Sequence, residues 1–141
     1  MDEVCTMTTI SEESAREQVA ILLDFYDIDP EYLPSDQANI VNTCIRKLTK
    51  SIMTGRLEIA KNDNNRPEVT QLTNSGEEIN YGVLSGKHRE ETSKVEKENN
   101  HYGKIYAMLG SMSGLGRSAI SQLEGPDLTT AEALGLLFLQ A

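Results

Sequence analysis

Residues that build covalent cross-links are scarce in this chain. Cys5 and Cys44 are the only cysteines among 141 residues. They lie far apart, one in a predicted N-terminal tail and the other in the apolar stripe of a predicted helix, which suits neither a disulfide framework nor a metal site. A chain of this length buries about 68–70% of its unfolded surface on folding, so it needs neither cross-links nor a metal to be stable. We therefore expect a protein of a reducing compartment.

The chain also lacks long apolar runs. None approaches the ~20 residues that a membrane-spanning helix needs. The first residues include Asp2 and Glu3, where a secretory signal peptide would carry positive charge. Both features predict a soluble cytoplasmic protein that does not bind membranes.

Basic charge is nearly absent from the first quarter of the chain. Residues 1–36 hold ten of the 22 acidic residues and one basic residue, Arg16, whereas the rest of the chain carries equal numbers of both signs. The net charge of −9 is thus concentrated in one region. Because affinity for nucleic acids comes mainly from Lys and Arg, we expect no nucleic-acid partner. The acidic region is either a solvated helix face or a surface for a basic partner, as in an acidic inhibitor or a DNA mimic acting through residues 1–36.

A flexible tail, residues 1–8, is predicted to precede a helical pair over residues 9–55. Thr9 with Glu12 three residues later is typical of a capping box, and the helix after it is expected to run to about Phe25. Apolar residues recur on one face of this helix with a period near 3.6. They are Ala15, Val19, Leu22, Leu23 and Tyr26.

Two prolines mark the connection to the second helix. Pro30 and Pro34 each disfavour helical backbone in the residue before them, which predicts a turn. Either Ser35 or Asp36 is expected to cap the second helix, and Gly55 is placed to end it. Its apolar stripe consists of Ile40, Val41, Cys44, Ile45, Leu48 and Ile52.

The hydrophobic period changes to two after Gly55. Three short strands are predicted over residues 56–84, joined by turn-forming residues at 61–66 and 73–76. They would form a small antiparallel meander with one polar face, which is stable only when its other face packs on helices. The apolar residues that define the strands are Leu57, Ile59, Val69, Ile79, Tyr81 and Val83.

Residues 87–98 are rich in charge, and Val95 is their one clearly apolar residue. This composition indicates either an exposed helix supported by pairs such as Glu90 with Lys94, or a connector that orders on binding. The asparagine pair at 99–100 is placed to break such a helix.

Apolar residues at helical spacing return in the last third of the chain. Residues 102–112 predict a helix and residues 118–123 a short one. Thr129 with Glu132 forms a capping box that is expected to start a terminal helix. Residues 87–141 would thus form a C-terminal helical module.

These patterns together predict the fold class. The chain would be a single α+β domain over residues 1–141, mainly helical, with an N-terminal helical pair, a small three-stranded antiparallel meander and the C-terminal module. Its last apolar residues, from Leu134 to Leu139, must be covered by this domain or by a partner, because apolar side chains at a free terminus fray into water.

The glycine-rich segment GSMSGLGRS, residues 110–118, invites comparison with two catalytic motifs. A phosphate-binding loop needs more closely spaced glycines, a lysine where Arg117 stands, and a preceding strand. A nucleophile elbow also follows a strand, whereas Ser111 and Ser113 follow a predicted helical stretch. We therefore interpret these glycines as residues that end one helix and turn the chain into the next.

Metal ligands are equally sparse. His88 and His101, the only histidines, lie in polar surroundings with no cysteine or second histidine at ligand spacing. Paired carboxylates such as Glu77 and Glu78 are most simply loop residues solvated by water. We expect no catalytic residues, no cofactor and no metal ligands, and hence a protein that is not an enzyme.

The order of the predicted elements and the ending of the chain carry a family resemblance. A short β section opens with GRLEI, a charged stretch follows, and YAMLGSMSGLGRSAISQLEGPDLTTAEALGLLFL leads to the end of the chain. This order, over about residues 36–141, resembles the small tail assembly proteins, or tail assembly chaperones, of long-tailed bacteriophages. In that group a helical segment of similar form is followed by a turn and a terminal helix. The matching residues here are Leu109, Gly110, Leu115, Ile120, Leu123, Asp127, Leu128, Phe138 and Leu139.

The resemblance implies a function in phage assembly. It implies a non-enzymatic protein that binds the aggregation-prone tape measure protein in the host cytoplasm and is absent from the finished virion. A related alternative is a virion structural protein, in the tail or at the head-tail connection.

The C-terminal module is where a partner is expected to bind. A long helical client needs transient cover for its apolar stripes, which a groove with adaptable side chains can supply. Self-association into a homo-oligomer is a second use of such a surface, and the alternative to both is that the same residues are plain core. The candidate partner-binding residues are Met108, Met112, Leu134, Leu137 and Phe138.

Overall fold

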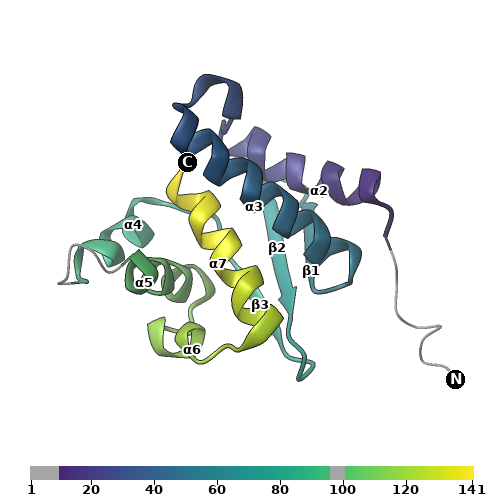
Figure 1. Cartoon of the computed structure of the whole chain (residues 1–141). Helices are drawn as coiled ribbons and strands as arrows, with labels where there is room; N and C mark the ends of the chain where they lie inside the picture. The colour runs from purple at the N-terminus through teal and green to yellow at the C-terminus, as the bar shows by residue number, and fades with distance from the viewer. Residues whose placement is uncertain (1–9, 96–100) are drawn as a thin grey trace, which may run out of the picture.

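A computed structural model describes residues 10–95 and 101–141 and confirms the predicted α+β class. Helices from both ends of the chain pack against an antiparallel sheet of strand order β1-β2-β3 (Figure 1). The helices are α2 (Glu12–Phe25), the 3₁₀ turn η1 (Pro30–Tyr32), α3 (Ser35–Met53), α4 (Gly86–Ser93), α5 (His101–Ser113), α6 (Arg117–Ser121) and α7 (Gly125–Leu139). The strands are β1 (Leu57–Lys61), β2 (Pro67–Leu72) and β3 (Glu78–Tyr81).

The sheet has one buried face and one exposed face, as its two-residue period predicts. Strand pairing places Ile59 beside Val69 and Val69 beside Tyr81 on the inner face, where all three are buried. On the outer face, the hydroxyl of Thr70 donates a hydrogen bond of 3.0 Å to the side-chain oxygen of Asn80. The meander therefore depends on the helices that cover its inner face.

The third strand is shorter than predicted. It ends at Tyr81, and the N–H of Gly82 donates a hydrogen bond of 2.8 Å to the carbonyl of Met112 in α5. Val83 is therefore outside the strand and only partly buried. This hydrogen bond to α5 uses the N–H of Gly82, which is therefore not available to extend β3.

The first helix has a different cap from the one predicted. Ser11 is the N-cap of α2, and its hydroxyl accepts a hydrogen bond of 3.1 Å from the N–H of Ser14. The predicted capping box with Thr9 is therefore wrong, and Thr9 itself lies outside the described residues. Glu12 instead accepts a hydrogen bond of 2.8 Å from Arg16, one turn along the helix. Ala15, Val19 and Leu22 are buried as predicted, whereas Leu23 and Tyr26 are only partly buried.

The second helix starts without a side-chain cap. Pro34 occupies the N-cap position of α3, so neither Ser35 nor Asp36 caps the helix as predicted. Pro34, with φ −56° and ψ 153°, has the extended backbone that an N-cap residue adopts, and it has no N–H to leave unpaired. Gly55, with φ +82°, follows the end of α3 as predicted. The predicted stripe is buried at Val41, Cys44, Leu48 and Ile52, whereas Ile45 is partly buried and Ile40 is 37% exposed.

The charged segment after the sheet forms α4, so the exposed helix is the one of the two predicted alternatives that the structure has, although its ion pair differs from the predicted one. The ammonium of Lys94 lies 2.8 Å from the carboxylate of Glu91, and the predicted pair with Glu90 is not formed. Lys94 is the C-cap residue of α4, and Glu91 lies three positions before it. The predicted helix breaker at 99–100, and residues 96–98 before it, lie outside the described residues.

Two of the three glycines in residues 110–118 separate helices as predicted, whereas Gly110 lies within α5. Gly114 (φ +75°) and Gly116 (φ +93°) turn the chain between α5 and α6. Helix α7 begins at Gly125, so the predicted capping box at Thr129 is wrong. Pro126 in the first turn explains the earlier start, because its ring holds φ near the helical value.

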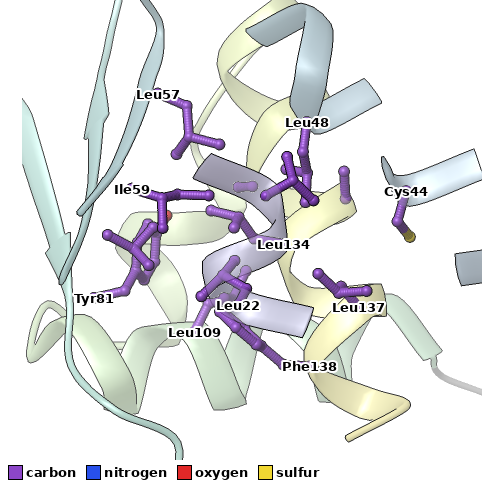
Figure 2. Close-up of a cluster of buried hydrophobic side chains, with 14 of the residues drawn as sticks. Leu22, Cys44, Leu48, Leu57, Ile59, Tyr81, Leu109, Leu134, Leu137 and Phe138 are labelled. Carbon is purple, nitrogen blue, oxygen red and sulfur yellow. The ribbon is translucent and has the colours of Figure 1, made fainter. Parts of the chain in front are cut away.

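Helix α7 lies at the centre of the fold (Figure 1) and contacts α3, α5, α6 and β2. Figure 2 shows Leu134, Leu137 and Phe138 of α7 among side chains from α2, α3, β1 and α5. These three residues are at most 1% exposed. The rest of the chain therefore covers these three residues of the apolar ending, whereas Leu136 and Leu139 are only partly buried.

A buried polar network joins the start of α7 to the sheet. The amide nitrogen of Gln71 donates to the carbonyl of Asp127, and the amide oxygen of Gln71 accepts from the hydroxyl of Tyr81, both at 2.8 Å. The carboxylate of Asp127 accepts from the N–H of Asn74 at 3.1 and 3.2 Å. Pairing matters here because a buried polar group without a partner costs about 1–3 kcal/mol. Burial raises the pKa of the Tyr81 hydroxyl well above its ordinary value.

Candidate partner-binding surface

The five residues predicted to bind a partner all lie in the core. Met108, Leu134 and Leu137 have no exposed surface, Phe138 is 1% exposed and Met112 is 5% exposed. In this fold they act as core residues, which is the alternative that their spacing also allows. Binding through them would require α5 or α7 to leave the core, so their role in partner binding stays a prediction.

A surface groove lies instead between α3 and α7, with the start of α5 beside it. We term it the α3–α7 groove. The two helices lie next to each other in Figure 1 and are in contact. The groove has a volume of about 280 Å³ and is lined by Asn39, Ile40, Thr43, Cys44, Lys47, Tyr102, Glu132, Ala133 and Leu136.

Apolar side chains from three helices reach the surface at this groove. Ile40 of α3 is 37% exposed and Tyr102 of α5 is 58% exposed, while Leu136 of α7 is half-buried. Large apolar side chains gathered around a concave surface are typical of sites that bind another protein. The groove is therefore the best candidate for partner binding in the described part of the chain.

Small residues form the floor of the groove. Cys44 and Ala133 line it, yet each is only 2% exposed, so they lie at its bottom. Burial raises the pKa of the Cys44 thiol to about 11, and the thiol is therefore protonated at neutral pH and behaves as a small apolar group. A floor of this kind leaves room for an apolar side chain inserted from outside.

A pair of tyrosines fixes one wall of the groove. The hydroxyl of Tyr106 donates a hydrogen bond of 2.6 Å to the carboxylate of Glu132, which connects α5 to α7. The rings of Tyr102 and Tyr106 lie 6.3 Å apart between centroids. Burial and the hydrogen bond to Glu132 raise the pKa of Tyr106 to about 12. Glu132 is thus engaged within the protein, and Tyr102 stands beside this connection.

Sequence periodicity does not distinguish the groove from the core. It assigns Ile40 to the buried stripe of its helix and places Leu136 in a terminal helix whose apolar residues are not confined to one face. The position of Ile40 at the margin of its stripe is the single local signal of exposure. Which other residues line the groove depends on the packing of α3 against α7, two helices that are distant in sequence.

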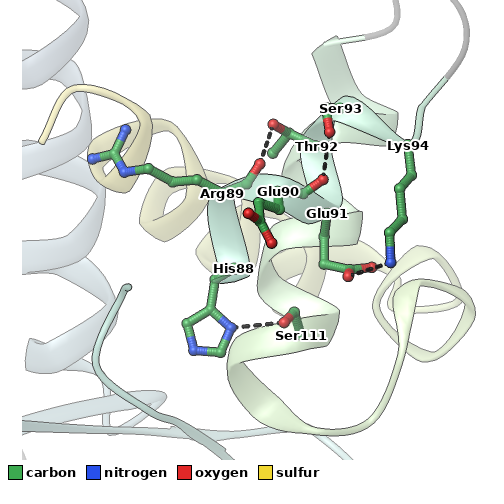
Figure 3. A network of polar contacts seen from close by, with 8 residues as sticks. All are labelled: His88, Arg89, Glu90, Glu91, Thr92, Ser93, Lys94 and Ser111. Carbon is green, nitrogen blue, oxygen red and sulfur yellow. Dashed lines mark hydrogen bonds and ion pairs between the residues drawn. The ribbon is translucent and has the colours of Figure 1, made fainter. Parts of the chain in front are cut away.

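The structure also joins two residues that the sequence keeps apart. The sequence predicts polar surroundings for His88, but in the structure its side chain is only 7% exposed. The Nδ1 atom of His88 lies 2.7 Å from the hydroxyl of Ser111 (Figure 3). Burial, with the positive charge of Lys87 as a smaller cause, lowers the pKa of the His88 imidazole. A histidine beside a serine occurs in hydrolases, but Ser111 lies within α5 and not at a strand-to-helix turn. The contact is a link between α4 and α5.

Among residues 10–95 and 101–141, no group of three or more His, Cys, Asp and Glu residues is arranged to hold a metal ion. Within the same ranges, no helix has both the length and the apolar character that crossing a membrane requires. Comparison of the chain with protein-family models, curated proteins and solved structures found no match.

Proposed function

We propose that this chain is a non-enzymatic tail assembly chaperone of a long-tailed phage, which binds a helical segment of the tape measure protein in the host cytoplasm. The α3–α7 groove carries the proposal, because a groove between two helices with apolar side chains at its edges accepts the apolar face of a partner helix. The resemblance of residues 36–141 to small tail assembly proteins supplies the class of client.

The exposed groove residues suit a transient complex. Ile40, Tyr102 and Leu136 each keep part of their apolar surface in contact with water. Covering that surface with a client helix contributes on the order of a few kcal/mol, at about 25 cal/mol per Å² of apolar area. A chaperone must release its client when the tail is complete, so a contribution of this size fits the role better than a large permanent interface.

Co-expression with the tape measure protein of the same phage tests this proposal. We expect the tape measure protein to be soluble and to co-purify with this chain, and to aggregate when expressed alone. Ile40→Gln with Tyr102→Gln should weaken the complex roughly tenfold, since both replacements remove apolar contact area. Leu72→Gln with Leu115→Gln is the matched control, because these residues are 42% and 55% exposed and lie outside the groove. A tape measure protein that is equally soluble without this chain would contradict the proposal.

The alternatives give different outcomes. A virion structural protein would be found in purified virions at fixed stoichiometry by mass spectrometry, whereas a chaperone is present only in the lysate of infected cells. An acidic inhibitor or DNA mimic would bind through residues 1–36. Its binding would be abolished by neutralising four acidic residues, Glu12, Glu13, Glu17 and Asp24, and would be unaffected by the groove variant.

A further inference from the structure

The α3–α7 groove continues into a second cavity along the same two helices. Lys47 lines both the groove and this cavity, which has a volume of about 500 Å³. The groove joins residues 39–47 of α3 to residues 132–136 of α7, and the second cavity joins residues 47–51 to residues 126–130, so the helices run antiparallel here. We term the second cavity the basic end. It is lined by Lys47, Lys50, Ser51, Arg56, Pro126, Thr129 and Thr130.

The charge of the basic end is unusual for this acidic chain. The net charge of the protein is −9, yet residues 37–57 contain four basic residues and no acidic residue. The side chains that line the cavity comprise three cations and three hydroxyls, with no carboxylate among them. The hydroxyls of Ser51 and Thr130 are bonded to each other at 2.8 Å, so the three cations are the groups that attract negative charge and donate hydrogen bonds to a ligand.

The three cations of the basic end are not neutralised by the described part of the chain. Other exposed cations, in α2 and at the end of α4, pair with glutamates about one turn away. No carboxylate within residues 10–95 and 101–141 forms an ion pair with Lys47, Lys50 or Arg56. Arg56 donates from Nη1 to the hydroxyl of Thr54 at 2.9 Å, and its Nε is buried with no hydrogen-bond partner among the described residues.

We propose that the basic end binds the carboxylates of a partner helix whose apolar stripe occupies the rest of the α3–α7 groove. This inference rests on the proposed function and specifies its client as an amphipathic helical segment that is acidic at one end. From Asn39 to Ser51 helix α3 rises about 18 Å, so the segment needs about 12 helical residues to span both parts of the groove. The charge at one end then determines the direction in which the client lies.

Charge and polarity favour a protein segment over a nucleic acid. Ile40 and Leu136 offer contacts to apolar side chains, which a phosphate backbone does not provide. Helix α2 packs against α3 and exposes Glu12, Glu13 and Glu17. These carboxylates repel phosphates, whose density along a nucleic acid is far higher than that of acidic residues along a helix.

Neutralising the basic end tests the inference in the complex with the tape measure protein. We expect Lys47→Gln, Lys50→Gln and Arg56→Gln together to weaken binding roughly tenfold. The salt dependence of the affinity should fall at the same time, because exposed charge pairs are screened by salt. The double variant at Lys47 and Lys50 changes exposed residues alone. It should lose affinity in the same direction, which separates the effect of charge from any effect of the partly buried Arg56 on folding.

A matched control removes the same charge elsewhere. Lys61, Lys87 and Arg117 are exposed and lie outside the groove and the basic end. Replacing these three by Gln lowers the net charge equally, so binding should stay within about twofold of the wild type if position matters more than total charge. A loss as large as that of the basic-end variant would overturn the inference.

Designed peptides separate the contribution of carboxylates to the affinity from the contribution of apolar side chains. Three helical peptides of about 12 residues would share one apolar stripe and end in Glu, Gln or Lys residues. The wild-type chain should bind the Glu-ended peptide most tightly in fluorescence anisotropy, and the basic-end variant should bind the Glu-ended and Gln-ended peptides equally. Wild-type protein that does not distinguish the three peptides would overturn the inference. Binding of a single-stranded oligonucleotide that is lost in the basic-end variant would overturn the choice of a protein partner.

Binding of the tape measure protein to the wild-type chain and to the basic-end variant distinguishes the two proposals. A tape measure protein that does not bind the wild-type chain contradicts the proposed function. A tape measure protein that binds the wild-type chain and the basic-end variant equally well contradicts the acidic-helix inference alone.

Discussion

At the scale of single residues, His88 gives an almost fully exposed helix a fixed position. It is the one buried residue within α4, and its imidazole bonds to Ser111 at 2.7 Å. The neighbouring Arg89 donates a hydrogen bond of 2.8 Å to the backbone carbonyl of Ala141. The two contacts hold a helix of very polar sequence against α5 and the end of the chain.

Protonation of His88 is expected to destabilise the fold at acidic pH. Since burial lowers its pKa in the folded state, the unfolded chain binds more protons between that lowered pKa and the ordinary value of 6.5. The contribution of neutral His88 to the free energy of unfolding is therefore complete above about pH 6.5 and declines as the pH falls through this window. Urea unfolding at about pH 7.5 and about pH 5 should show a smaller loss of stability in His88→Asn than in the wild type.

The second histidine offers a control for this measurement. His101 is exposed at the start of α5, and His101→Asn supplies the matched variant. An unchanged pH dependence in His88→Asn would show that the buried imidazole does not couple folding to pH.

At the scale of elements, the crossing of α5 and α7 depends on a glycine. A Cβ atom added to Gly135 would overlap with Cγ2 of Ile105 and lie 3.3 Å from Cδ1 of Leu109. The two helices approach each other more closely than a side chain at this position allows. Gly135 therefore has a packing role, although glycine lowers helix propensity.

Replacing Gly135 by alanine should show whether packing or helix propensity has the larger effect on the free energy of unfolding. We expect Gly135→Ala to lower the free energy of unfolding by about 1–3 kcal/mol because of overpacking, even though Ala is favoured over Gly in a helix interior by about 1 kcal/mol. Gly86→Ala is the control, since no atom lies within 4 Å of a Cβ added there. Chemical denaturation of both variants checks the prediction, and equal stability of Gly135→Ala and the wild type would contradict it.

Local patterns predicted the elements well and several of their boundaries poorly. Periodicity identifies α2, α3 and the three strands because each has one face in the core. Boundaries depend on partners far along the chain. The third strand stops before Val83 because Gly82 bonds to Met112, and the early start of α7 is accompanied by the bond from Gln71 to Asp127.

At the scale of the whole molecule, α7 connects the N-terminal helices and the sheet with the C-terminal helices. Truncation after Thr130 would remove Leu134, Leu137 and Phe138, each of which is almost completely buried. Loss of a single such side chain costs about 2–5 kcal/mol, and a whole domain is stable by only about 5–15 kcal/mol. We therefore expect the truncated chain to be unfolded by circular dichroism and by amide dispersion in NMR spectra.

A shorter deletion controls for the loss of the terminus itself. Removing Gln140 and Ala141 leaves the buried residues of α7 in place and should preserve cooperative unfolding. A truncation after Thr130 that still unfolds cooperatively would contradict the central role of α7. If the truncated chain is unfolded as expected, partner binding must be tested with groove variants and not with truncation.

The sequence by itself determined the elements and the distribution of charge. Two hydrophobic periods identify helices and strands, and residues 1–36 and 37–57 have opposite charge whatever the fold. Tertiary structure alone decided which apolar residues form the core and which line the α3–α7 groove. Leu134 and Leu136 belong to one helix whose apolar residues are not confined to one face, and packing against α3 and α5 buries the first and leaves the second at the groove. The reason is physical: burial depends on contacts between residues distant in sequence, which local periodicity does not encode.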